Sequence, residues 1–281
     1  DPVLMSDSRQ MGRQRPRRSY RAVIESLRQV WSIERVPDND SIWRLGNPSW
    51  SALPARDLRI SVWNLCKGAG GILFEHDYRM LCYASDIIIT QEALLSRHAL
   101  SMFCASGFEA VHAASYKRRD GLRDGVMTVA RAASCAEPQR IICKYPEPIF
   151  KTPKAALIKQ YPLEGTDQRL MVINVHATLV RRVAAAIEEM EHIIERLPEH
   201  SGPVILAGDF NTFTSGYLRA ITRVLLKVGL EYVPIPSDPR PTTQALDQLF
   251  CRGLRVTSAK VDTSYRNSDH FPIVATLSIV S

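Results

Sequence analysis

The sequence predicts a mixed fold of the α/β or α+β class, with sheets and helices packed in layers. Apolar, strand-like segments are interspersed with amphipathic helical segments between residues 58 and 281, and several apolar segments end in acids, amides or histidines. The chain has 281 residues, of which 45% are hydrophobic, so it can bury a sizeable core. We therefore expect strand ends at the edge of a sheet to supply a functional site.

The expected strands are apolar runs that either alternate with polar residues or are apolar throughout. The first is LRISVWNL, in which Leu58, Ile60 and Val62 alternate with other side chains. In chain order, the expected strands are 58–65, 86–90, 125–131, 155–163, 169–177, 204–210, 245–253, 254–261 and 271–280.

Two segments have the periodicity of an amphipathic helix. The first covers 183–197, where apolar residues recur at steps of four, three, four and three, and Pro198 is expected to end it. The second covers 216–228.

Residues 1–57 are expected to form a basic N-terminal extension that is partly disordered and packs on a domain formed by residues 58–281. Seven arginines and three acids lie in residues 1–30, so this segment carries more than half of the net charge of +7. We expect disorder in 1–20 and a short helix over 23–30. The arginines suit contact with nucleic acid or an anionic membrane surface, and a solvated tail is the alternative.

The sequence is that expected of a monomeric cytoplasmic protein. No apolar run has the length needed to span a membrane. The six cysteines form no CxxC pair, which indicates reduced thiols. A periplasmic or secreted protein is the alternative, because the sequence begins at Asp1 and not at Met.

Polar residues end or interrupt six of the apolar segments. Acids, amides and histidines are costly in a core unless they are paired or bind metal. One such residue is most often structural, but six places in one chain are hard to explain separately. These residues are Asn64, Glu92, His176, Asp209, Asn211, Asp247, Asp269 and His270.

Some of these side chains suit a divalent cation. Glu92 with Asn64 or Asp269 offers hard oxygen ligands, which favour Mg²⁺ or Mn²⁺ over zinc. A magnesium site, with manganese as the alternative ion, is therefore expected.

The others suit attack of water on a phosphoester. Asp209 or Asp247 can orient or deprotonate the water, and Asn211 can hold it in line. His176 and His270 can donate to phosphate oxygens as charge develops. Together they indicate metal-assisted hydrolysis of a phosphoester.

The motifs WN, QE, NxH, GDFN, LDxLF and SDHxP occur in this order between residues 58 and 280. Their ordered set resembles the endonuclease/exonuclease/phosphatase superfamily, which includes DNase I-like nucleases, abasic-site endonucleases, inositol-phosphate phosphatases and bacterial sphingomyelinases. VWNL, GVMT, KxAL and SGPVILAGDFN are similar to its bacterial YafD-like branch.

The resemblance implies a four-layer sandwich of two packed mixed sheets flanked by helices. It implies that Asn64 and Glu92 bind the metal with Asp269 nearby, and that His176 contacts the scissile phosphate. It also implies that Asp209 and Asn211 handle the water, or Asp209 the leaving group. Asp247 would support this cluster, while Asp269 would hold the imidazole of His270 against the phosphate.

The chain departs from some branches of this superfamily. The nucleases pair a carboxylate with the counterpart of His176, a role that Asp120 or Asp124 can fill here. QEALL lacks the lysine of the abasic-site enzymes, and ALDQLF lacks the motif of the inositol phosphatases.

Basic residues favour a polyanionic substrate. Arg123 and Lys154 are candidate phosphate ligands beside expected strands, with a solvated loop or surface lysine as the alternative. We expect a Mg²⁺-dependent phosphodiesterase or nuclease acting on nucleic acid. The alternatives are a phosphatase or phospholipase C-type enzyme acting on a phospholipid or small phosphoester, and a non-catalytic binding module.

Overall fold

A computed structural model provides the structure of the chain. It describes residues 33–280 except for 69–70, 97–106, 149–150, 196, 237 and 241–244. The expected disordered arm and short helix, together with the arginine-rich segment, lie outside the described residues.

The first sheet contains eight strands in the order β1-β5-β6-β4-β3-β14-β13, and β2 also pairs with β5. Its strands β3 and β4 are parallel and the other pairs are antiparallel. The strands are β1 (Ile33–Glu34), β2 (Ile42–Leu45), β3 (Leu58–Asn64), β4 (Ile87–Leu95), β5 (Glu109–Arg118), β6 (Arg123–Ala130), β13 (Leu254–Val261) and β14 (Ile273–Ile279).

The second sheet contains six strands in the order β11-β12-β10-β9-β8-β7. Its strands β9 and β10 are parallel, so this sheet is mixed as well. The strands are β7 (Gln139–Ile142), β8 (Ala155–Pro162), β9 (Arg169–His176), β10 (Val204–Asp209), β11 (Glu231–Tyr232) and β12 (Asp247–Arg252).

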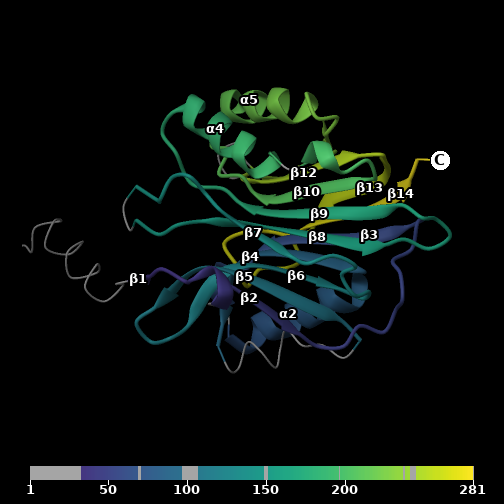
Figure 1. The fold of residues 1–281 in the computed structure, drawn as a ribbon, viewed down its shortest axis with the longest axis horizontal. Helices are drawn as coiled ribbons and strands as arrows, with labels where there is room; N and C mark the ends of the chain where they lie inside the picture. The colour runs from purple at the N-terminus through teal and green to yellow at the C-terminus, as the bar shows by residue number, and fades with distance from the viewer. Residues whose placement is uncertain are drawn as a thin grey trace, which may run out of the picture. The chain divides into compact units, whose positions relative to one another are not determined.

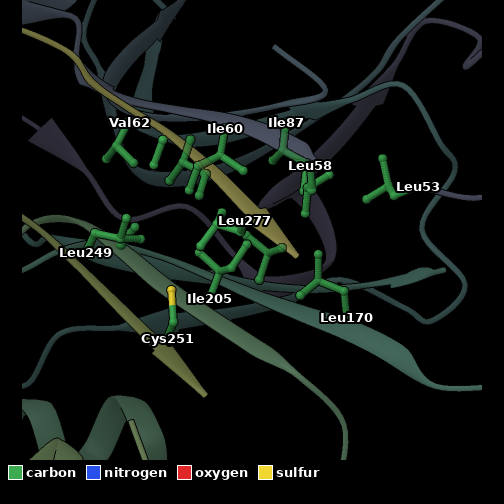
Figure 2. Close-up of a cluster of buried hydrophobic side chains, with 14 of the residues drawn as sticks. Leu53, Leu58, Ile60, Val62, Ile87, Leu170, Ile205, Leu249, Cys251 and Leu277 are labelled. Atoms are coloured by element: carbon green, nitrogen blue, oxygen red, sulfur yellow. The ribbon is translucent and has the colours of Figure 1, made fainter. Parts of the chain in front are cut away.

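The two sheets pack face to face through a buried apolar core. Figure 2 shows Ile60 and Val62 of the first sheet facing Ile205 and Leu249 of the second. Alternate side chains of these strands point into this core, as the sequence pattern predicts.

Helices cover the outer faces of both sheets (Figure 1). α2 (Gly71–Ala84) packs on the first sheet, where the Phe74 and Trp63 rings lie 5.4 Å apart. α4 (Val183–Ile194) and α5 (Ser215–Leu226) cover the second sheet with Met190 and Val224 among their buried residues. The expected four-layer α+β sandwich is therefore confirmed. Short 3-10 helices are η1 (Asp38–Asp40), η2 (Cys66–Gly68) and η3 (Leu197–Glu199).

The structure adds elements that the sequence pattern did not predict. β5 is alanine-rich, and alanine has little preference for strands. α2 exposes Ile72, Leu73 and Tyr83 opposite its buried face, which blurs its periodicity. β1 and β2 pair with β5, so part of the expected N-terminal extension is built into the first sheet.

Among the described residues, no helix has the length and apolar character needed to cross a membrane. The described cysteines are free thiols, and Cys82, Cys143 and Cys251 are buried, whereas Cys135 is exposed.

Candidate active site

The centre of the candidate site is a row of three side chains across the second sheet. Asp209 at the end of β10 is paired in register with His176 of β9 on one side and with Asp247 of β12 on the other. All three residues are buried and extend the inward-facing positions of their strands. The pairing of the strands therefore brings together two acids and a histidine that lie 33 and 38 residues from Asp209.

Asp209 is held by groups from both sheets. Asn64, at the end of β3, donates from Nδ2 to Asp209 Oδ2 over 3.0 Å, and the backbone N–H of Asn211 donates to Oδ1 over 2.9 Å. Asn211 itself has φ 51° and donates from Nδ2 to the carbonyl of Ala177 over 2.8 Å. The carboxylate is thus fixed in orientation while it faces the neighbouring acid, Asp247.

The protein environment of Asp209 raises the pKa of its carboxyl group above the value in water. Burial, and then the negative charge of Asp247, raise the pKa of Asp209 to about 6. An acid with such a pKa is ionised at neutral pH and can still accept a proton, as general-base catalysis requires.

The imidazole of His270 is held by Asp247, and not by Asp269 as expected. His270 Nδ1 lies 2.8 Å from Asp247 Oδ2, whereas Asp269 is exposed and accepts from Ser268 Oγ at 3.4 Å. Burial opposes protonation of His270, but the Asp247 carboxylate outweighs it and raises the pKa of His270 to about 9. His270 is therefore a cation at neutral pH.

The loop that carries His270 is fastened to β3. Ser268 Oγ donates to the carbonyl of Asn64 over 2.7 Å, and Trp63 Nε1 donates to the carbonyl of His270 over 2.9 Å. This attachment places Asp269 beside Cys66, where burial and then Asp269 raise the pKa of the thiol. The expected metal ligand Asp269 thus lies near Asn64.

Arg240 is a member of the site that the sequence analysis missed. Its Nη1 lies 3.3 Å from Asp247 Oδ2, and its Nη2 lies 2.8 Å from Asp238 Oδ2. The side chain is 4% exposed. Arg240 lies in a loop that follows no strand pattern, so only the structure relates it to Asp247.

Glu92 enters the site because β4 carries a bulge. The register with β6 shifts between Thr90 and Ala93, so Gln91 and Glu92 together oppose one residue of β6, and Glu92 has φ 49°. Strict alternation would give Glu92 the direction of the outward-facing Thr90. The bulge instead aims its carboxylate at Lys67 and Lys154.

Two lysines contact the Glu92 carboxylate. Lys67 Nζ lies 2.6 Å from Oε2, and Lys154 Nζ lies 3.5 Å from Oε1. Burial would raise the pKa of Glu92, but the neighbouring His176, Lys154 and Lys67 side chains lower it to about 2. Lys154, a candidate phosphate ligand, is therefore buried in the site, and Lys67 is a second residue that the sequence analysis missed.

His176 is neutral in this environment. Burial, and then the positive charge of Lys154, hold the pKa of His176 well below its usual range. Its Nε2 lies 3.7 Å from Asp209 Oδ2. A neutral imidazole can donate one N–H to a phosphate oxygen without bringing a second charge.

Two other expected residues, Arg123 and Asp120, lie elsewhere. The Arg123 guanidinium pairs with Asp40 and lies 4.7 Å from the centroid of the Trp43 ring, so its contacts do not support the expected phosphate ligand. Asp120 pairs with Arg118 in an exposed turn, which argues against it as the partner of His176.

Asp124, the other candidate partner of His176, lies near the site. It is buried, accepts from Tyr116 Oη over 3.2 Å, and lies 3.8 Å from Lys67 Nζ. Burial raises the pKa of Asp124 to about 6. Its direct contacts are thus with Tyr116 and Lys67.

The donors of the site fit a hard divalent cation. One carboxylate oxygen of Asp209 and one of Asp247 lie within 4.8 Å of each other, beside the protonated His270. Asp247 Oδ1 is buried without a hydrogen-bond partner, although such atoms are normally satisfied. Carboxylate and amide oxygens dominate the surroundings, as Mg²⁺ and Mn²⁺ prefer.

Gly208 allows Asp209 to reach its position. Its φ is +142°, and a Cβ there would lie 1.9 Å from the carbonyl oxygen of Val175. We expect Gly208→Ala to lower the free energy of unfolding by about 2–3 kcal/mol because β9 and β10 must separate. Urea unfolding measures this change.

Gly216→Ala is the matched control. A Cβ at Gly216 would make only ordinary contact, at 3.5 Å from Thr214 Oγ1, and the residue lies in α5. Alanine should raise stability there by about 0.5–1 kcal/mol. Equal effects of the two substitutions would contradict the proposed close approach at Gly208.

Comparison with known proteins identifies similar sequences and folds. The profile of the Endonuclease/Exonuclease/phosphatase family matches residues 62–270. A UPF0294 protein of Yersinia enterocolitica is 32% identical over 240 residues, which cover 82% of this chain and 87% of the relative.

Solved structures with similar folds include enzymes with different named substrates. A mannosyl-6-phosphatase of Bacteroides thetaiotaomicron has a TM-score of 0.60 at 18% identity and covers 79% of this chain and 100% of its own. Sphingomyelinase C of Streptomyces griseocarneus has a TM-score of 0.55 at 16% identity, over 78% of this chain and 99% of its own. At these identities the likeness concerns the fold.

Proposed function

Because this chain belongs to the endonuclease/exonuclease/phosphatase family, we propose that it is a divalent-metal-dependent hydrolase of phosphoester bonds. One observation carries the proposal: the buried row of His176, Asp209 and Asp247, completed by His270 on Asp247. The proton acceptor Asp209, the neutral donor His176 and the cationic His270 are thereby brought together.

Each residue has a role that follows from its surroundings. Asp209, oriented by Asn64 and Asn211, accepts a proton from the attacking water. His270, kept protonated by Asp247, donates to a phosphate oxygen on which charge develops. Neutral His176 donates to a second oxygen.

Glu92 and Asn64, with Asp269 nearby, would hold a Mg²⁺ ion, with Mn²⁺ as the alternative. That cation, when bound, polarises the phosphate and stabilises its developing charge. The free Oδ1 of Asp247 and the carboxylate of Asp209, which accepts from Asn64, offer further oxygen ligands.

A phosphodiester of nucleic acid is the first substrate class that we propose. Its main support is the arginine-rich segment within residues 1–30. Residues 117–123 contain one lysine and three arginines. They add less support, because Lys117 pairs with Glu34 and Arg123 with Asp40.

A phosphatase or phospholipase C-type activity on a small phosphoester or phospholipid is the second candidate. Lys67 and Lys154 favour it, because they concentrate positive charge at the site and not along a path for a polymer. The mannosyl-6-phosphatase and the sphingomyelinase C with similar folds are named for compounds of this kind.

An assay panel tests the proposal. It contains plasmid DNA, bis-p-nitrophenyl phosphate, p-nitrophenyl phosphate and sphingomyelin, each with Mg²⁺, with Mn²⁺ or with EDTA. We expect hydrolysis of at least one compound, a loss of at least about 100-fold in EDTA, and recovery when the metal is restored.

Asp209→Asn protein prepared in the same way controls for a contaminating hydrolase. A wild-type protein that is inert on the whole panel, or equal to this variant, would favour the non-catalytic binding module.

A further inference from the structure

Both carboxylate oxygens of Glu92, an acid expected to bind the metal, are in contact with lysine ammonium groups. Lys67 Nζ lies 2.6 Å from Oε2 and Lys154 Nζ lies 3.5 Å from Oε1. A divalent cation bound by Glu92 needs at least one of these oxygens. An ammonium group at that oxygen therefore competes with the cation for the negative charge of Glu92.

The backbone on both sides of the contact between Lys67 and Glu92 has an uncommon conformation. Lys67 has φ 58° and Glu92 has φ 49°, and Cys66 beside Lys67 has φ 46°. Non-glycine residues in this conformation are uncommon, and such strain tends to persist where function requires it. The bulge in β4 aims Glu92 toward Lys67, so both partners of the ion pair depend on special backbone geometry.

Each lysine has a second carboxylate to contact. Lys67 Nζ lies 3.8 Å from Asp124 Oδ2, and Lys154 Nζ lies 2.8 Å from Glu147 Oε1. Lys67 is the less enclosed of the two, since 29% of its side chain is accessible compared with 8% for Lys154. Lys67 can thus leave Glu92 and stay in the site.

Both lysines also lie close enough to His176 to disfavour its protonation. His176 is the imidazole to which we assign a phosphate oxygen. A phosphate bound there would bring negative charge to the side of the site that holds both ammonium groups, and charge-assisted contacts of this kind are strong.

We propose that Lys67 neutralises Glu92 until a divalent cation takes that carboxylate, and that its ammonium group then binds an oxygen of the substrate phosphate. This inference rests on the proposed function and adds a residue and an order of binding to it. Lys154 keeps its ion pair with Glu147 and supplies a second, fixed positive charge to the site. The ligand class is a phosphoryl anion, carried by a monoester or a diester.

The inference predicts opposite effects of one substitution on two ligands. In Lys67→Met, Mn²⁺ alone should bind about threefold to tenfold more tightly, because a competing charge is removed. With Mn²⁺ saturating, inorganic phosphate should bind about tenfold more weakly, because a cationic partner is lost. Isothermal titration calorimetry measures both affinities without turnover.

Three further variants complete the test. Lys67→Gly removes the same charge and tolerates positive φ, so it should reproduce both shifts even if Lys67→Met folds poorly. Lys67→Arg keeps the charge and should stay within about twofold of wild type in Mn²⁺ affinity. Lys260→Met is the control, because Lys260 is exposed near the end of β13 and its ion pair is with Asp262, which follows that strand, and not with Glu92.

Unchanged or weaker Mn²⁺ binding in both neutral variants would overturn the inference, and so would unchanged phosphate binding. Repeating the phosphate titration with methyl phosphate and dimethyl phosphate distinguishes a monoester from a diester ligand. A wild-type protein that is inert on the assay panel defeats the proposed function, whereas these binding results alone decide the role of Lys67.

Discussion

Replacing Asp209 by asparagine is expected to lower kcat/KM for the phosphoester substrate by about 10³-fold, within the usual range for loss of a general base. Asparagine has nearly the same shape and keeps an oxygen for the N–H of Asn211, so the strand pairing should survive. It cannot accept the proton of the attacking water. The loss should therefore appear mainly in kcat.

The pH profile provides an independent measurement. Because the pKa of Asp209 is raised to about 6, its carboxylate form is populated above that pH and lost below it. Wild-type activity should therefore fall as the pH decreases through about 6, and the residual activity of Asp209→Asn should lack this acidic limb.

Asp262→Asn serves as the matched control, since Asp262 binds Ser264 and Lys260 outside the site. Its activity should stay within about twofold of wild type. If Asp209→Asn retained more than about a tenth of wild-type activity, Asp247 would become the better candidate for the base.

The mixed α/β or α+β class could be predicted from repeated local patterns, whereas the family came from the resemblance of the ordered motifs, which implied the four-layer sandwich. Alternation along β3 places Ile60 and Val62 inward, and continuing it by two residues places Asn64 inward as well. The same reasoning applies to His176 and Asp209 at the ends of β9 and β10. The sandwich and the superfamily resemblance are accordingly confirmed.

The details of the site that could not be predicted depend on exceptions to these patterns. Alternation contains no signal for the bulge that turns Glu92, or for the positive φ of Lys67 that brings its ammonium group there. Arg240 reaches Asp247 from an irregular loop, so no periodicity relates the two.

The expected pairing of Asp269 with His270 was wrong for a geometric reason. Adjacent residues in a loop do not share a direction, and here the loop is fixed by Ser268 and by the carbonyl of His270 itself. This attachment leaves Asp269 exposed and turns the imidazole toward Asp247. Whether a histidine has a particular partner therefore depends on tertiary contacts of its backbone.

Asp247 and His270 are expected to act as one unit, so their substitutions should not be additive. His270→Ala and Asp247→Asn should each lower kcat by about 10²–10³-fold, because each removes the charged donor to the phosphate. The double variant should lose little more than the worse single variant, as found for groups that depend on each other. Single-turnover kinetics on the four proteins measures the coupling.

The pH dependence of activity distinguishes an Asp247–His270 pair that acts together from two residues that act independently. His270 is protonated below its pKa of about 9, so wild-type activity should fall as the pH rises through about 9. In Asp247→Asn the carboxylate that raises this pKa is absent, so the alkaline limb should move toward the ordinary histidine pKa of about 6.5. His270→Ala should have no such limb. If the limb stayed near pH 9 in Asp247→Asn, Asp247 would not be the group that keeps His270 protonated, and additive losses would then be expected.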